Sequence, residues 1–547
     1  MKKKKILALL CLLCLFLTGC MGNGSQESSE QSFRELENKP EKLVVYITGV
    51  ASSFMQDDGE MYTRYPTPYS VGLHFMGGDM QAEQGNIFYD ALMQYGEERG
   101  ITMEIHFLAD KSGMEDFTQD VLQYAYEQGE APDLIVVSKY TELDFYRLQQ
   151  QGQLVDFSDY VQSDEALQNE EAYFGKVLDG GMIHDEQVVM PLLFNMNAMV
   201  TGKNWLGRAG LAEPTEETSY EEILHMLEQS CLETAGSDIQ EAVQEISGRM
   251  FLGSYIPSIL LAGATDSYFN EENTAHTLDE QLLTDIFTVM QQYQAQELNG
   301  KSMEEASTGQ SKSQTFLMLE PQVAVEQTGI FLTGGRSGSI DMYNTFLYDL
   351  AFLKAVYEEA GDEMVWSGIP TAQEAGAYNA NITAMALAPA STQYPEAVYD
   401  AIRYLMDYEY TPYYGFSVNR HITNQQLEAA QTSSLKTYPD LWNSLESGNM
   451  SREEIESQAV EVPPLDAQTV ERVGQMLDHI ASAGLPFGIL EYDMVYEALS
   501  AMSEGTLDAA GASRYLIETM DRYMQERSAM KPYYDMNFMQ SLWGSAS

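Results

Sequence analysis

Basic residues are scarce in this chain. It has 29 Lys and Arg against 83 Asp and Glu, which gives a formal net charge of −54. Nucleic acids and anionic lipid surfaces are bound through a basic face, so this charge argues against both as partners. A cationic ligand stays open, and a strongly charged surface also keeps an exposed protein in solution.

The common signatures of enzymes are also missing. The sequence has no HExxH motif, no CxxC pair, no GxSxG turn and no phosphate-binding P-loop. The neighbours of His184 and Asp185 favour a solvent-exposed turn over a catalytic dyad. We therefore expect no catalytic residue, no metal and no cofactor, although the many acids leave the carboxylate pair of a glycosidase open.

The first residues have the pattern of a secretory signal peptide. Lys2 to Lys5 precede an apolar run that ends at Leu17, which is shorter than the roughly 20 residues that span a bilayer. The letters "LTGC" then resemble the lipobox of bacterial lipoproteins, which implies that Cys20 is lipidated and begins the mature chain. We expect a signal peptide over 1–19, and the lipidated Cys20 with a flexible linker over 20–41.

Cysteine is too rare for a disulfide framework. Cys11 and Cys14 lie in the expected signal peptide and Cys20 is the expected lipidation site, so Cys231 alone is left. We expect Cys231 to be buried in a helix. The remaining chain of roughly 500 residues is long enough for two substantial domains that rest on their hydrophobic cores.

Apolar runs and amphipathic segments alternate along the first part of the chain. The pattern predicts strands over 42–49, 101–108 and 132–140, helices over 84–100 and 117–130, and a long aromatic loop over 49–83. Such alternation is typical of a parallel sheet with helices on its faces, in which ligands lie beyond the carboxyl ends of the strands. Lys139 and Tyr140 follow one of these strands. Further along, Ser219 and Glu222 have the spacing of a helix capping box.

Aromatic side chains and asparagines beside loops are the positive functional signal. Tyr, Phe and Trp make up 11% of the chain. Sugars present apolar C–H faces ringed by hydroxyls, so flat rings beside amides and carboxylates suit them. For each candidate taken singly, a ring at the core edge or an asparagine in a turn is the alternative. The candidate ligand-binding residues at strand ends and crossings are Lys139, Tyr140, Phe194, Asn195, Asn197, Trp366, Tyr378, Asn379 and Asn381.

Several stretches, in this order, resemble the extracellular solute-binding proteins of bacterial ABC importers, the group that includes maltose-binding protein. They are "APDLIVVSKY" with "GQLVDFSDYV", "VVMPLLFNMNAMVTGKNWLGRAGL", "TSYEEILHML" and "SEGTLDAAGASRYLIETMDRYMQE". The resemblance covers most of residues 42–530. The chain departs from the family where Val200, Thr201 and Gly202 replace a frequent Tyr-Asn, and where Tyr220 replaces a common tryptophan.

The resemblance implies an α/β, two-lobed fold of the periplasmic-binding-protein type (type II), with a cleft between the lobes. Hinge crossovers are expected near 185–197 and 370–382. The first part of lobe I is expected over 42–188 and the first part of lobe II over 189–378. Residues 379–430 would return to lobe I, and C-terminal helices over 431–547 would complete lobe II.

The function that this resemblance implies is solute capture for an importer. Closure of the lobes would trap a small solute, expected to be a sugar, for delivery to an ABC permease. Tyr140 and Trp366 would be stacking platforms, and Asn195, Asn197 and Asn381 hydrogen-bonding groups. We expect a monomer on the extracellular face of the bacterial plasma membrane, held there by its diacylglyceryl anchor.

Three alternatives stay open at this point. The same fold can bind a peptide, a polyamine or another cation, which the acidic balance permits. A surface glycoside hydrolase or lyase would instead turn over an oligosaccharide. A sensor subunit would report to a membrane kinase instead of feeding a permease.

Overall fold

The computed structural model describes residues 36, 38–50, 87–109, 132–138, 144–234, 255–265, 267–297, 330–333, 346–409, 415–437, 460–487 and 489–527. The chain divides into two units, Met1–Lys39 and Pro40–Ser547. Within the described residues, the second unit contains all the helices and strands, which form an α/β arrangement with two main sheets. The expected α/β fold class is therefore confirmed.

The larger sheet begins with three parallel strands, as the apolar runs predict. β1 (Lys42–Val50) lies between β2 (Thr102–Ala109) and β3 (Leu134–Ser138). The side chains of Leu43 to Ile47 are buried, which is typical of a parallel strand that is covered on both faces. The helix α3 (Ile87–Arg99) connects β1 to β2 and packs against β2.

Four further strands complete this sheet of seven. β10 (Tyr378–Leu387) runs antiparallel to both β3 and β6 (Met190–Asn195). β11 (Phe416–Ser417) pairs with the outer edge of β6, and β14 (Ile480–Gly484) runs parallel to the first half of β10. Because β10 is long, its second half pairs with β3 while its first half reaches beyond the carboxyl end of β3.

The smaller sheet has three antiparallel strands. β7 (Ala198–Gly202) lies between β8 (Ile330–Thr333) and β9 (Met364–Gly368). The chain passes from β6 to β7 through Met196 and Asn197, and it returns from β9 to β10 through residues 369–377. Two crossings, both within the segments expected from the sequence or beside them, thus join the sheets. The lobe boundaries drawn from the sequence stay a prediction.

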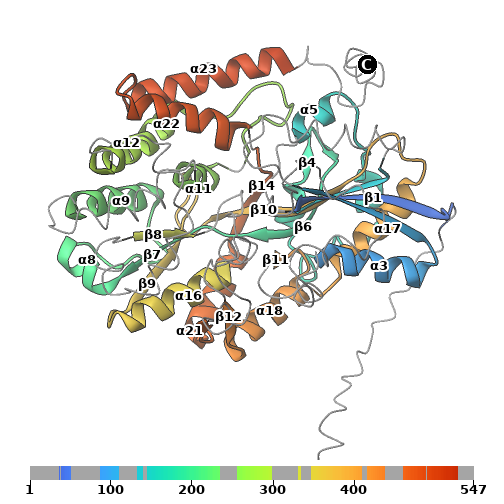
Figure 1. Ribbon diagram of the computed structural model, residues 1–547, viewed down its shortest axis with the longest axis horizontal. Helices are drawn as coiled ribbons and strands as arrows, with labels where there is room; N and C mark the ends of the chain where they lie inside the picture. The colour runs from blue at the N-terminus through green and yellow to red at the C-terminus, as the bar shows by residue number, and fades with distance from the viewer. Residues whose placement is uncertain are drawn as a thin grey trace, which may run out of the picture. The chain divides into compact units, whose positions relative to one another are not determined.

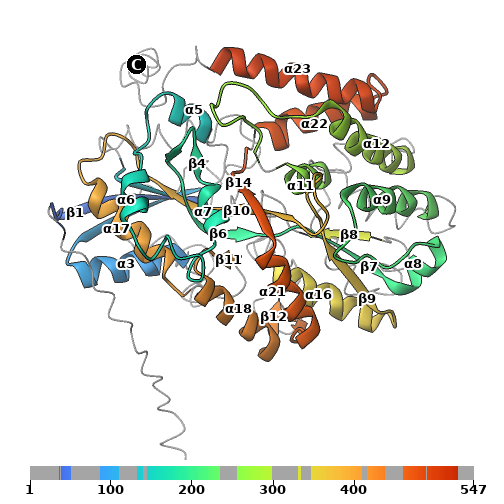
Figure 2. The ribbon, with the colours of Figure 1, turned by 180° about the vertical axis from the view of Figure 1, so that it is seen from behind.

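Helices pack around both sheets (Figures 1 and 2). α17 (Pro395–Met406) lies beside α3 on the larger sheet, and α16 (Phe346–Glu359) packs on β7 and β9. The other elements between β3 and β9 are α5 (Phe145–Gln150), α6 (Ser158–Ser163), α7 (Gly175–Asp179), β4 (Met182–Ile183), β5 (Glu186–Gln187), α8 (Lys203–Ala209), α9 (Tyr220–Thr234), α11 (Tyr255–Ala264) and α12 (Glu280–Glu297). Those after β11 are α18 (Arg420–Thr432), β12 (Leu435–Thr437), β13 (Val460–Val462), α21 (Ala467–Asp478), the π-helix η4 (Ile489–Met494), α22 (Val495–Ser503) and α23 (Ala509–Arg527).

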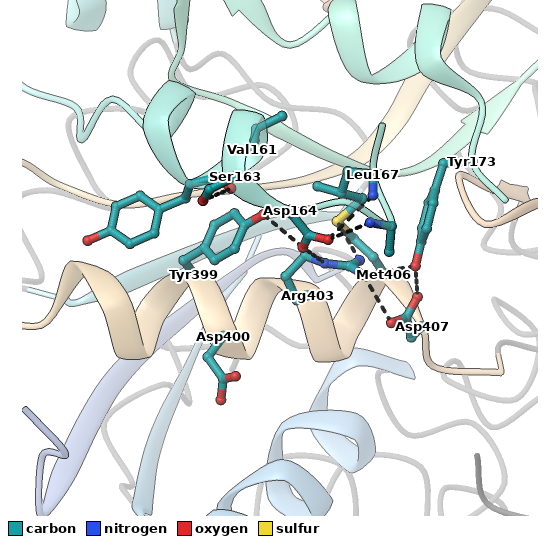
Figure 3. A network of polar contacts seen from close by, with 12 residues as sticks. Val161, Ser163, Asp164, Leu167, Tyr173, Tyr399, Asp400, Arg403, Met406 and Asp407 are labelled. Atoms are coloured by element: carbon teal, nitrogen blue, oxygen red, sulfur yellow. Dashed lines mark hydrogen bonds and ion pairs between the residues drawn. The ribbon is translucent and has the colours of Figure 1, made fainter. Parts of the chain in front are cut away.

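Arg403 fastens α17 to the segment that follows α6 (Figure 3). Its Nε donates to Asp164 at 2.7 Å, and its Nη2 donates to the Tyr173 hydroxyl at 3.0 Å and lies 3.4 Å from Asp407. The Tyr173 hydroxyl donates in turn to Asp407, and the Tyr399 hydroxyl donates to Asp164 at 3.2 Å. These contacts join parts of the chain more than two hundred residues apart, because α17 presents one polar face to them.

A second polar cluster holds the end of α23. The Tyr523 hydroxyl donates to the carboxylate of Asp144, which caps α5, and Arg527 donates to the carbonyl of Asn273. Asp144 is fully buried, and burial raises the pKa of its carboxyl. The last described helix is therefore tied to the helix that follows β3.

Two local predictions from the sequence, a helix cap and an exposed turn, are confirmed. The capping box of α9 is confirmed, since Ser219 N donates to Glu222 Oε2 at 2.7 Å and Glu222 N donates to Ser219 Oγ at 3.2 Å. His184 and Asp185 form the exposed turn between β4 and β5, with φ of 54° and 60°. The expected signal peptide over 1–19, Cys20 and most of the linker over 20–41 lie outside the described residues. So do the aromatic loop beyond Val50, the helix expected over 117–130 and the Cys231 side chain. None of the described helices has the length and apolarity that a membrane span requires.

Candidate functional site

A cavity of about 300 Å³ lies where β9 passes to β10. Its buried walls come from Trp366, Gly368, Tyr378 and Met476, and Arg472 of α21 lines it as well. Figure 2 shows α21 next to β14, and β14 pairs with β10. The cavity therefore belongs to the junction of the two sheets.

Exposed polar side chains surround the mouth of this cavity. Glu216, Glu374, Gln475 and His479 line it and are exposed to solvent. The site thus combines an aromatic interior with carboxylates and an amide at the rim, which is the distribution expected for a small polar ligand with apolar faces.

Glycine at position 368 gives the cavity its shape. A Cβ atom there would lie 2.5 Å from Cε1 of Tyr378 and 2.8 Å from the methyl carbon of Met476. Both distances are too short for carbon atoms, so only glycine lets the Tyr378 ring lie against β9. The backbone N–H of Tyr378 donates to the carbonyl of His479 at 3.1 Å, which fixes the start of β10 beside α21.

Arg472 is held against Trp366 by two contacts. Its Nη2 donates to the carbonyl of Trp366 at 2.8 Å, and its guanidinium carbon lies 4.5 Å from the centre of the indole ring. A guanidinium over an indole face is a favourable cation–π arrangement. The Phe346 ring packs edge-on against the same indole, with the two ring centres 6.0 Å apart. Trp366 is only 4% exposed, so its visible role here is to orient Arg472.

Tyr378 keeps its hydroxyl proton at neutral pH. Burial is the main reason that its pKa lies above 10, and the carboxylate of Glu216 raises it further, while Arg472 partly offsets both effects. A neutral phenol can donate a hydrogen bond to a ligand as well as accept one.

The predicted asparagines bind one another and the backbone around the crossings. Asn381 Nδ2 donates to Asn197 Oδ1 at 2.7 Å, and both side chains are buried. Asn379 Nδ2 donates to the carbonyl of Gly263 at 3.0 Å, and Asn195 Oδ1 accepts from the N–H of Phe346 at 3.1 Å. These amides join the two crossings to α11 and α16. A ligand-binding role for them stays a prediction.

Phe194 lies in the core of the larger sheet. It is fully buried, with its ring 5.1 Å from that of Phe174 and 5.6 Å from that of Phe416. Lys139 and Tyr140 lie outside the described residues. Of the seven predicted ligand-binding residues that the structure describes, Trp366 and Tyr378 line the cavity.

Sequence reasoning missed Arg472, which is 106 residues from Trp366 along the chain. One signal was available. Thr469, Val473, Met476 and Leu477 form the buried face of α21, and Arg472 precedes Met476 by one helical turn. A cationic side chain next to the buried face of a helix usually contacts a polar or aromatic group from another part of the fold.

In the ranges that the structure describes, no three His, Cys, Asp or Glu side chains gather as metal ligands would. The polar groups of the cavity are suited to hydrogen bonding and to ion pairing with a solute.

Solved structures that resemble this chain include solute-binding proteins of ABC transporters. A substrate-binding protein from Listeria monocytogenes in complex with cycloalternan is 11% identical with a TM-score of 0.44, over 89% of this chain and 100% of that one. A family 1 extracellular solute-binding protein from Alicyclobacillus acidocaldarius is 12% identical with a TM-score of 0.45, over the same shares. The lacto-N-biose-binding protein of a Bifidobacterium longum transporter is 11% identical with a TM-score of 0.47, over 90% and 99%. No protein-family model and no curated protein sequence matches the chain.

Proposed function

We propose that this protein is an extracellular solute-binding protein that captures a carbohydrate at the junction of its two sheets and delivers it to an ABC permease. The observation that carries the proposal is the cavity between β9, β10 and α21, with Tyr378 and Arg472 inside and carboxylates at its mouth.

The chemistry of this cavity suits a sugar. The phenol ring of Tyr378 and the side chain of Met476 offer apolar surface to the C–H face of a pyranose. Ser367, Gln475, Glu216 and Glu374 offer donors and acceptors for its hydroxyls. A volume of about 300 Å³ lies at the lower end of the range for small-ligand sites, which fits one or two sugar rings.

The cellular setting in this proposal follows from the lipobox resemblance. Diacylated Cys20 would hold a monomer at the outer face of the bacterial plasma membrane, and the segment over 20–41 would be its tether. The crossings at Asn197 and at 369–377 would serve as the hinge between lobes.

Thermal unfolding of the purified chain against a panel of ligands tests the proposal. A ligand that binds only the folded state raises the unfolding midpoint. We expect such a rise with one class of mono- or oligosaccharide, without products on chromatography. If only peptides or polyamines raise the unfolding midpoint, the proposal of a sugar ligand would be overturned. If the glycan is broken down, the protein would be an enzyme.

A pair of glycine variants locates the site. Gly368→Ala places a methyl group against Tyr378 and Met476, so we expect it to abolish the ligand-dependent rise. Gly474→Ala, in the same helix as Arg472, has no atom within 4 Å of the added carbon and should keep it. Equal responses of the two variants would place the ligand elsewhere.

A further inference from the structure

We propose that the solute is an acidic sugar whose carboxylate is bound by Arg472 inside the cavity. This inference rests on the proposed function and narrows its ligand class. It is carried by a contrast between Arg472 and other arginines of the same fold.

Arg472 has no carboxylate partner among the described residues. Its contacts are the carbonyl and the ring of Trp366. Three other described arginines also lie over aromatic rings. Arg403 pairs with Asp164 and Asp407, and Arg420 pairs with Asp478 at 3.0 Å. Arg527 binds a ring and the Asn273 carbonyl, as Arg472 binds those of Trp366, but Arg527 is 1% exposed, lies near the buried Asp144 carboxylate and does not line the cavity.

This contrast is notable because of the composition. The chain has 83 acidic residues for 29 Lys and Arg, so an arginine can readily find a carboxylate in it. Arg472 instead lines a cavity. Two carboxylates line the same cavity, from Glu216 and Glu374, but both are exposed at the mouth and neither forms an ion pair with Arg472.

The guanidinium is also oriented in advance. A guanidinium has five N–H donors in a rigid planar fork that matches a carboxylate. The Trp366 carbonyl accepts from Nη2, and the indole face supports the plane of the group. Because these two contacts fix the side chain, little rotamer entropy remains to be lost when a carboxylate binds.

The placement of charge then sets the orientation of the ligand. A sugar carboxylate would lie inside, against Arg472, with the ring on Tyr378. The hydroxyls would face outward, where Glu216 and Glu374 can accept hydrogen bonds from them. A neutral sugar would supply no carboxylate to the guanidinium.

Calorimetric titration of the purified full chain tests this inference. The ligands are disaccharides that contain glucuronate or galacturonate, their methyl esters, and the corresponding neutral disaccharides. We expect an acid to bind at least about tenfold more tightly than its ester, the factor that one charge-assisted hydrogen bond provides. Arg472→Gln should remove this preference, so that the acid and its ester bind with equal affinity. Arg472→Lys should keep part of it, because an ammonium retains the charge without the fork.

Arg420→Gln is the matched control. Arg420 lies 4.0 Å from the Phe174 ring centre and pairs with Asp478, but it does not line the cavity. We expect this variant to keep the preference for the acid. Equal affinities of acid and ester in the unsubstituted chain, or an equal loss of both in Arg472→Gln, would overturn the inference.

The two proposals fail in different ways. If neutral disaccharides bind and a carboxylate does not increase the affinity, the proposal of an acidic sugar would be overturned and the proposal of carbohydrate capture would stand. Absence of binding by every saccharide in the panel would overturn both.

Discussion

Removal of Arg403 should destabilise the chain strongly for a single side chain near the surface. The guanidinium pairs with Asp164 and Asp407, and the side chains of the three residues are 14%, 21% and 19% exposed. Breaking a fully buried pair costs about 3–5 kcal/mol, whereas an exposed pair contributes about 0–1 kcal/mol. The network lies between these limits and nearer the buried one. We therefore expect Arg403→Met to lower the free energy of unfolding by about 2–3 kcal/mol.

Methionine is chosen because it keeps an unbranched apolar side chain and removes the guanidinium, with its charge, its donors and its contact with the Tyr173 ring. Urea unfolding followed by circular dichroism measures the shift in midpoint at constant slope. The control is Arg514→Met, because Arg514 pairs with Glu280 at 4.0 Å with both side chains more than half exposed. It should change stability by less than about 0.5 kcal/mol. Equal midpoints for the two variants would refute the reasoning that burial gives the network its strength.

Three further predictions concern single side chains. Ser219→Ala removes the cap of α9 that Glu222 completes and should cost about 1 kcal/mol in urea unfolding, whereas Ser219→Asp should keep most of it. Asn381→Ala removes the hydrogen bond that Asn381 Nδ2 donates to the buried Oδ1 of Asn197, and it should lower the free energy of unfolding by about 1–3 kcal/mol. An unchanged free energy of unfolding would contradict the importance of this bond. Burial raises the pKa of Asp349 to about 8. The folded chain therefore keeps the Asp349 proton up to about pH 8, whereas the unfolded chain loses it near pH 4. The free energy of unfolding should then fall as pH rises from 4 to 8, because the unfolded state binds fewer protons than the folded state over this range. Asp349→Asn removes this titration, so its free energy of unfolding should vary less with pH.

Local patterns predicted the elements better than their partners. The apolar runs at β1, β2 and β3 identify buried parallel strands, because only burial on both faces tolerates so few polar residues. The capping box at Ser219 is visible for the same reason, since its donors and acceptors lie within one turn.

Long-range pairing left no comparable signal. β14, with the sequence "IASAG", has too little apolar surface to be predicted as a strand, and it is one because β10 offers it an edge. The cavity depends on Arg472 meeting Trp366 across 106 residues, and no local period records that contact. Trp366 and Tyr378 were identified as aromatic residues near expected strand ends and crossings; in the structure Trp366 is the middle residue of β9 and Tyr378 begins β10. Asn197 and Asn381 were also identified, although the structure uses their amides to bind each other.

The short joint between β6 and β7 limits how the two sheets can move. Only Met196 and Asn197 separate the two strands, and successive Cα atoms are about 3.8 Å apart. A joint of this length has no slack, so the sheets cannot slide or separate there without breaking strand pairs. In the proposed hinge, torsion about a few backbone bonds would remain, and the joint would act as a pivot. Atoms near the pivot then keep their distances, while displacement grows with the radius from it. The carbonyl of Asn197 accepts from the N–H of Ile369 at 2.9 Å, directly after Gly368 in the cavity wall. A small rotation at this joint would therefore change the angle between the cavity walls more than their spacing.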